Sequence, residues 1–314
     1  MNFGAGFFLP YVFEPTVLVL CVAAVVLYTR GLVRRRRAGK VTAWPRALAF
    51  FLGVVFVYAV LQTHFDYMAQ HLFFLHRTQH LFLHHLAPFL IMLSAPGAIL
   101  AAGVPERFRV RFLRPVACSA FVRWPYRAIQ QPIVAGLLFV GLIYLWLIPF
   151  VHFYAMLNIP LYNTMNWSMA VDGLLFWYLI FCSPKPRDGG MHYGWRILLL
   201  AAVIPPQIVV GAYIALCGKD LYPIYATCGR LWPISPTTDQ SLGGLITWIP
   251  SAMMSVIGAI VVIHRWMHED DEPDEELVTE PATRDVPASV PEPEPQSAPS
   301  VSAVHARDEP VRSF

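Results

Sequence analysis

Apolar runs long enough to cross a bilayer recur along most of this chain, and arginine-rich connections separate them. Of its 314 residues, 56% are hydrophobic and 14% are charged, whereas a soluble domain carries about 25% charged residues. A helix of about 20 apolar residues spans the hydrocarbon core, where every backbone polar group needs a partner. The pattern therefore predicts an all-α, polytopic bundle of membrane helices.

Seven spans are expected from these runs. They cover approximately Thr16–Thr29, Pro45–Gln62, Gln79–Ala102, Pro132–Phe150, Thr164–Cys182, Arg196–Cys217 and Leu242–His264. No cleavable signal peptide is expected, because the first run ends at Arg30 without a small-residue cleavage site.

Basic residues are concentrated in alternate connections. Residues 30–46 hold seven of them, residues 103–130 hold six arginines, and residues 183–196 hold three, whereas the intervening connections hold few. Basic connections stay on the cytoplasmic side of a membrane. We therefore expect the N-terminus outside and the C-terminus inside.

The composition changes completely after His268. Residues 269–314 are rich in acidic residues, proline, alanine and serine. Such a segment cannot bury enough apolar surface to fold alone. We predict a transmembrane helical domain over residues 1–268 and a disordered, acidic, Pro-rich cytoplasmic tail over residues 269–314, which either solubilises the protein or docks a partner.

Six of the eleven histidines lie in the segment from residue 62 to residue 88. They are His64, His71, His76, His80, His84 and His85. His76, His80 and His84 recur every four residues, which would place them on one face of a helix. Two imidazoles at this spacing can ligate one metal ion.

The histidine pattern predicts a metal site on the outer side. Imidazole suits copper, zinc, iron and nickel, and a thioether adds a preference for Cu(I). We expect His76 and His80 to form its core and His84, His71 or Met68 to complete it. The alternative is that some of these histidines sit at the headgroup level and bond to water or backbone.

Polar residues elsewhere are candidates to support this site. Asp66 is a possible hydrogen-bond acceptor for a ligand imidazole. Asp239 and Gln240 precede the seventh span, where Asp239 either caps the helix or faces the histidines. Gly243 and Gly244 would let helices approach closely.

Three further residues are ambiguous. Asp172 is ionisable and lies inside an apolar run, which makes it a functional candidate. Cys217 and Cys228 are both on the predicted outer side, where either a disulfide or free thiols are possible. The chain shows no Ser-His-Asp arrangement, Gly-rich phosphate loop or redox cysteine pair, and topology explains its arginine runs. We therefore predict neither an enzyme nor a nucleic-acid partner.

Three stretches carry a family resemblance. The first is His-x-x-Gln-His at His76–His80, with Gln79, followed by Ala87-Pro88 and Ala95-Pro96. The second is Gly-Leu-Leu-Phe-Trp at Gly173–Trp177, and the third runs from Leu221 to Ile246 with Leu-Tyr-Pro, Arg-Leu-Trp, Asp-Gln and Gly-Gly-Leu-Ile. Over about residues 44–265 the chain resembles the CtaG family of cytochrome c oxidase assembly factors.

Two departures mark a divergent branch of that family. The family usually has Trp-His before the proline that ends the fourth span, where this chain has Leu147-Ile148-Pro149 and places His152 slightly later. It also usually has Glu-His about seven residues before Gly-Leu-Leu-Phe-Trp, where this chain has Met165-Asn166. Either the ligands have shifted onto the second and third spans, or the metal-handling role is altered.

The resemblance implies a non-enzymatic assembly factor that helps to insert copper into a haem–copper oxidase of a bacterial plasma (inner) membrane. Its expected partners are oxidase subunits, membrane lipid and other copper chaperones, with Gln79, Asp239 and Gln240 in supporting roles. Two alternatives remain open. A b-type haem cytochrome needs axial histidines on facing helices, and a copper permease needs polar ligands through the midplane, where only Asp172 and Asn166 interrupt the apolar interior.

Overall fold

The computed structural model describes residues 13–184, 186 and 189–268, so the predicted tail lies outside the described residues. The described helices belong to one unit, Met1–Asp270, and the described residues contain no strand. The helical segments, of which η2 and η3 are π-helical, are α1 (Pro15–Arg37), α2 (Trp44–Gln62), α3 (His64–His71), α4 (Phe73–His80), η2 (Leu81–Leu86), α5 (Ala87–Leu93), α6 (Gly97–Gly103), α7 (Glu106–Phe108), η3 (Arg109–Leu113), α8 (Arg114–Cys118), α9 (Ala120–Ile129), α10 (Pro132–Leu147), α11 (Pro149–Leu157), α12 (Ile159–Phe181), α13 (Tyr193–Leu216), α14 (Ile224–Cys228) and α15 (Pro236–Met267).

Proline sets the starts of many of these helices. A proline occupies the first or second position of α1, α2, α10, α11, α12 and α15. Its ring fixes φ near the helical value, and its missing N–H is one that the first turn would leave unpaired anyway. The helix boundaries in this chain are thus largely local properties of the sequence.

The all-helical architecture is confirmed for the described residues, and several of their helices could cross a membrane. Among the described residues, α1, α2, α13 and α15 are each long and apolar enough to cross a membrane. Two bent pairs raise the number to six if each is one span: Phe73–Leu93 with α6, and α9 with α10, each bent by 76°. The seven spans and their orientation stay predictions. The helix α12 is as long as α1 but is not one of these candidates. Its buried Asn166 and Asp172 interrupt the apolar run.

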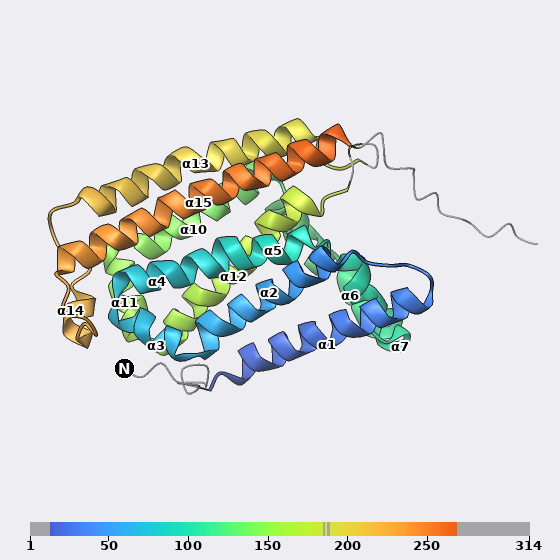
Figure 1. The fold of residues 1–314 in the computed structure, drawn as a ribbon, viewed down its shortest axis with the longest axis horizontal. Helices are drawn as coiled ribbons and strands as arrows, with labels where there is room; N and C mark the ends of the chain where they lie inside the picture. Colours follow the sequence, from blue (N-terminus) through green and yellow to red (C-terminus); the bar gives the residue numbers. More distant parts are fainter. Residues whose placement is uncertain (1–12, 185, 187–188, 269–314) are drawn as a thin grey trace, which may run out of the picture. The chain divides into compact units, whose positions relative to one another are not determined.

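A central row of α4, η2 and α5 runs through the bundle (Figure 1). This row packs on α15 through α4, on α12 through η2 and α5, and on α2 through α5. The helix α13 lies along α15, and α10 packs on both α12 and α13. All the histidines of the row are therefore surrounded by other helices.

Small residues allow the closest helix contacts. A Cβ on Gly31 would overlap the backbone of α6, and one on Gly103 would overlap the backbone of α1. The expected close approach at Gly243 and Gly244 is present: Gly244 lies against the backbone of α13, and Gly243 lies against the Phe73 ring. Small residues at helix interfaces are how membrane helices gain packing contacts.

The Gly-Leu-Leu-Phe-Trp stretch is a packing motif in α12. A Cβ on Gly173 would overlap the carbonyl of His84, so only glycine lets α12 approach η2 there. Phe176 and Trp177 are buried in the core, where Phe176 stacks on Phe139 with ring centroids 3.7 Å apart. This part of the motif positions the histidine row rather than supplying chemistry.

Candidate functional site

His76 and His80 form the centre of a buried polar site. Their side chains are one α-helical turn apart on α4, and the Nε2 atoms lie 3.1 Å from each other. Both residues are almost fully buried, at 0% and 1% exposure. The Nδ1 atom of each ring is buried without a hydrogen-bond partner. The spacing of four residues thus brings these two imidazoles together as predicted.

Asn166 joins the histidine pair from α12. Its Oδ1 lies 3.2 Å from the Nε2 of His80, and the side chain is buried at 3% exposure. A buried amide oxygen beside two imidazoles adds a third heteroatom to the site. The sequence marks Asn166 as a departure from the family pattern and as one of two polar residues that interrupt the apolar interior.

Asp66 and Gln79 belong to a hydrogen-bond network next to this site. The Oδ1 of Asp66 accepts from the Tyr162 hydroxyl and from Gln79 Nε2, both at 2.7 Å, and its Oδ2 accepts from Gln70 at 2.8 Å. Gln79 also donates to the Val60 carbonyl at 2.7 Å. Burial raises the pKa of Asp66, while these three donors oppose the rise. Asp66 therefore holds Gln79 and Tyr162 in place.

His152 approaches the pair from α11. Its ring centroid lies 5.1 Å from that of His76. Because a carbonyl only accepts, His152 Nδ1 donates to the Trp146 carbonyl at 3.0 Å, and Nε2 then accepts from the Tyr225 hydroxyl at 2.9 Å. Burial lowers the pKa of His152 to about 3, so the ring is neutral at physiological pH.

The structure gives His84 and His85 different partners. His84 Nε2 lies 2.9 Å from Asp172 Oδ2, and His84 Nδ1 lies 3.3 Å from His85 Nδ1. Both histidines are in the π-helical segment η2, where a turn contains more residues than an α turn. The four-residue spacing therefore does not keep His84 in register with His76 and His80. Asp172, a candidate from the sequence, is thus a hydrogen-bond partner of a histidine.

Two other predicted ligands lie in α3. His71 Nδ1 donates to the Tyr67 carbonyl at 2.8 Å. Met68 packs in a hydrophobic cluster with Ala69, Leu72 and Leu75. The structure places neither residue in contact with the His76–His80 pair.

Arg77 is a buried cation beside the pair that sequence reasoning missed. It is 3% exposed, and its Nε and Nη1 atoms have no hydrogen-bond partner. It lines a small cavity together with His80, His85 and Met169. The cavity volume of about 10 Å³ is close to that of a single water site. The only sequence signal was the position of Arg77 inside the His-x-x-Gln-His stretch.

Asp239 and Gln240 hold together the end of the bundle at which α4 begins. The Asp239 carboxylate accepts from the backbone N–H groups of Phe73 and Phe74 at 3.1 and 2.9 Å, so it caps α4 rather than its own helix. Gln240 accepts from Leu221 N at 2.7 Å and donates to three carbonyls at 3.1 Å, those of Ile214, Cys217 and Lys219. Both residues position backbone around the site.

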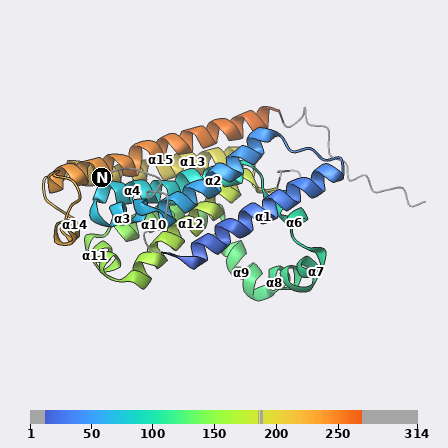
Figure 2. The ribbon, with the colours of Figure 1, turned by 60° about the horizontal axis from the view of Figure 1, so that its bottom comes forward.

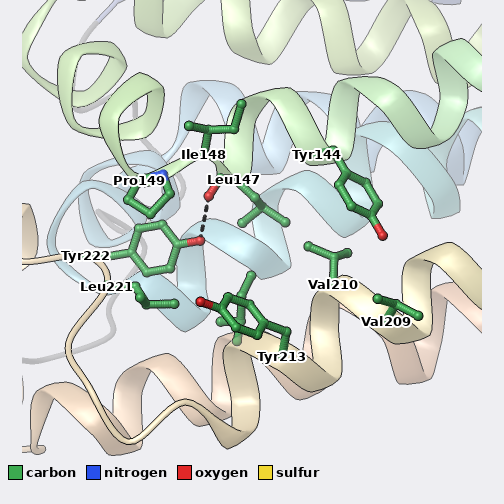
Figure 3. A pocket seen from close by; sticks show the side chains of 10 residues that line it. Tyr144, Leu147, Ile148, Pro149, Val209, Val210, Tyr213, Leu221 and Tyr222 are labelled. Atoms are coloured by element: carbon green, nitrogen blue, oxygen red, sulfur yellow. Dashed lines mark hydrogen bonds between the residues drawn. The ribbon is translucent and has the colours of Figure 1, made fainter.

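A larger cavity of about 340 Å³ opens between α10 and α13 (Figure 3). Its lining is apolar apart from three tyrosines, and no histidine lines it. The Tyr222 hydroxyl donates to the Leu147 carbonyl at 2.8 Å, and the Tyr222 ring stacks on Phe73 at the start of α4. This cavity suits an apolar molecule rather than an ion.

No group of three His, Cys, Asp or Glu side chains in the described part of the chain could hold a metal ion. The site is therefore two imidazoles and an amide oxygen, with a third imidazole nearby. Cys217 and Cys228 are free thiols, so the disulfide alternative does not apply in this structure.

Membrane helices around a buried cluster of histidines define a polytopic membrane protein with a polar centre in its core. The sequence matches the family model for the cytochrome c oxidase caa3 assembly factor, Caa3_CtaG, over residues 26–269. The chain belongs to this family of oxidase assembly factors.

Curated relatives of this chain occur in mycobacteria. A protein of Mycobacterium leprae (strain TN), "Uncharacterized protein ML1998", is 26% identical over 287 residues, covering 84% of this chain and 40% of that protein. A Mycobacterium tuberculosis protein (strain CDC 1551 / Oshkosh), "Uncharacterized protein MT0111", is 24% identical over 277 residues, covering 82% of this chain and 39% of that protein. The chain thus spans about two fifths of the length of these relatives. No solved structure matches it.

Proposed function

We propose that this chain helps to install copper in a haem–copper oxidase and carries the ion as cargo at His76 and His80. The main support for this proposal is that the Nε2 atoms of the two buried imidazoles lie 3.1 Å apart. Two nitrogens at this separation can both lie about 2.0–2.1 Å from one metal ion, the usual distance for imidazole and zinc. The family of oxidase assembly factors supplies the biological context.

The surroundings of the pair favour Cu(I) over harder ions. Imidazole and thioether ligands are both suited to Cu(I), and Met169 lines the same small cavity as His80. Asn166 offers an oxygen, which is a poor ligand for Cu(I). Two strong ligands and one weak one would hold the ion without enclosing it completely.

Incomplete coordination suits a delivery role. Sites that hold a metal permanently have all ligand positions filled by protein, whereas an open position admits another ligand. An incoming donor from the client oxidase would occupy that position and then draw the ion away. The Asp239 cap on α4 and the hydrogen bonds of Gln79 would keep both imidazoles in place during the exchange.

Copper loading of the purified full-length protein tests this proposal. His76→Ala combined with His80→Ala should abolish near-stoichiometric Cu(I) binding, measured by competition with a chromogenic Cu(I) chelator. The matched control is His64→Ala with His71→Ala, which removes two histidines from α3 and should leave binding unchanged. Visible absorption of the same samples reports any haem, which would favour the cytochrome alternative.

The proposal also predicts a phenotype. In cells that lack the chain, the wild type and the α3 control should restore oxidase activity, and the His76/His80 variant should not. Full copper binding and full oxidase activity in the folded double variant would refute the proposed site. Normal oxidase assembly without any copper binding by the wild type would instead indicate a scaffold that acts through protein contacts alone.

A further inference from the structure

The segment Glu106–Ile129, which comprises α7, η3, α8 and α9, forms an arm outside the bundle. Its helices contain no buried residue. The arm leaves the bundle after α6 and returns at α10 (Figure 2). A stretch of this length without a buried side chain gains little from packing against its own protein, so something else must cover its apolar residues.

Large apolar side chains are widely exposed on the arm. Phe121 is 90% exposed and Trp124 is 76% exposed, both on α9. Phe108 and Phe112 are also exposed, and their rings lie together with centroids 5.3 Å apart. Exposed aromatic residues at this density mark a surface that binds a partner or a membrane.

The arm is also strongly basic. Its six arginines are accompanied by a single acidic residue, Glu106, which lies 3.9 Å from Arg109. The other five have no acidic partner among the described residues and are exposed; they are Arg107, Arg111, Arg114, Arg123 and Arg127. The arm therefore presents uncompensated positive charge.

Charge and apolar surface are separated on α9. Residues three, four or seven apart share a helix face, so Phe121, Trp124 and Ala128 lie on one side. Arg123 and Arg127, four apart, form a separate row that is displaced around the helix from Phe121. A basic amphipathic helix with aromatic residues on its apolar face lies in the interface plane of a membrane.

The direction of α9 agrees with an in-plane position. It is bent by 76° from α10, which carries the chain back into the bundle. If α10 follows the membrane normal, α9 runs nearly parallel to the membrane surface. The arm begins close to the basic end of α1, because Arg34 donates to the carbonyls of Ala102 and Val104 at 2.9 and 3.3 Å.

We propose that the arm Glu106–Ile129 is a membrane-surface element that inserts its aromatic residues at headgroup depth and binds anionic phospholipids through its five unpaired arginines. Anionic lipids of the cytoplasmic leaflet attract juxtamembrane arginines, strengthening binding about fivefold for each. The arm would anchor the inner end of the bundle and make its geometry sensitive to the lipid composition.

Cys118 in α8 offers a reporter for this proposal because it is exposed within the arm. The full-length protein, with its other cysteines replaced by serine, would carry a spin label on Cys118 in lipid nanodiscs. One set of discs contains phosphatidylcholine alone, and the other an equal mixture with phosphatidylglycerol. Collision with oxygen and with a water-soluble nickel chelate measures the depth of the label.

We expect the label to move from water to headgroup depth when phosphatidylglycerol is present, and this shift to shrink at high salt. Replacing the five unpaired arginines by glutamine should abolish the lipid dependence, whereas replacing them by lysine should retain it. Phe121→Ser with Trp124→Ser should leave the label shallower in both kinds of disc.

Two results would overturn the proposal. One is a label that stays fully accessible to the nickel chelate in both kinds of disc. The other is a folded glutamine variant whose label depth depends on phosphatidylglycerol as in the wild type. That result would favour an acidic protein partner, rather than lipid, as the ligand of the arm. The salt dependence of the wild type tests the proposal even if the glutamine variant fails to fold.

Discussion

Asn166 is the residue at which this chain departs most informatively from its family. It stands where the family resemblance leads us to expect histidine, and its Oδ1 lies 3.2 Å from His80 Nε2. At the proposed copper site, an amide oxygen would bind Cu(I) more weakly than an imidazole does. The substitution therefore bears on how tightly the proposed cargo is held rather than on where it is held.

Substitution of Asn166 should change copper affinity in both directions. Asn166→His should raise the Cu(I) affinity at least tenfold, because it restores a third imidazole. Asn166→Ala should lower it about tenfold, because His80 loses the partner that orients its ring. Chelator competition measures both values. Asn163→His, one turn earlier on α12, is the control and should bind like the wild type.

Asp239 shows how one buried carboxylate stabilises a distant helix. It accepts from the first two N–H groups of α4, which has no cap from its own N-terminal residue. It also lies 3.4 Å from Arg230. Removing an acceptor leaves buried donors unpaired, which costs about 1–3 kcal/mol for each group.

Asp239→Ala should therefore destabilise the protein by about 2 kcal/mol or more and lower the Cu(I) affinity, because the first turn of α4 would fray beside His76. Unfolding in mixed detergent micelles measures the stability. Asp220→Ala is the matched control. Asp220 is partly exposed, lies 4.0 Å from the same arginine and accepts one backbone hydrogen bond, from Tyr222 N at 3.0 Å, so its loss should cost clearly less than that of Asp239. Equal losses in the two variants would contradict the capping role.

At the scale of helices, backbone contacts at glycines determine how closely the helices pack, and the π-helical segment determines where the histidines of η2 point. Gly31 and Gly103 bring α1 and α6 into backbone contact, and Gly173 does the same for α12 and η2. The wide turn of η2 directs His84 toward Asp172. The histidine row is thus divided into two pairs, and only the first of them faces Asn166.

Adding one methyl group should separate α1 from α6. Gly103→Ala places a Cβ into the Leu27 carbonyl, so we expect a loss of about 1–3 kcal/mol, as for other overpacked sites. Gly141→Ala is the matched control, because nothing lies within 4 Å of its added Cβ and alanine favours a helix over glycine. Thermal unfolding in detergent should show a lower midpoint for Gly103→Ala only.

At the scale of the whole molecule, the arginine-rich connections predict the orientation of the bundle in the membrane. The arm Glu106–Ile129 and the basic last turn of α1 gather at one end. The α14 segment and the Asp239 cap lie at the other, beside the start of α4 (Figure 1). Positive charge at one end predicts that this end faces the cytoplasm and that the His76–His80 pair lies toward the outer side.

Two exposed cysteines test this orientation. Cys118 lies in the arm and Cys228 lies in α14. In single-cysteine variants, a membrane-impermeant maleimide added outside should label Cys228 in whole spheroplasts, while Cys118 should react only in inverted vesicles. Labelling in denaturing detergent controls for thiol reactivity. The opposite pattern would reverse the predicted topology and place the proposed copper site on the cytoplasmic side.

The sequence by itself determined the properties that depend on local spacing. Long apolar runs gave membrane helices, prolines set helix starts, and the four-residue spacing brought His76 and His80 together on one turn. The stretches that carry the family resemblance could also be recognised in the sequence, because each consists of residues close together in the chain. Each of these features depends on residues within a few positions of one another, where backbone geometry is fixed.

Only the tertiary structure decided which distant groups meet the histidines. Asn166 contacts His80 across 86 positions, and Asp172 contacts His84 across 88. Asp239 caps a helix that begins 166 positions earlier. The four-residue rule also failed beyond His80, because the π-helical turn shifts the register. Helix packing, which sums many small contacts between remote segments, selects these partners, and no local pattern encodes them.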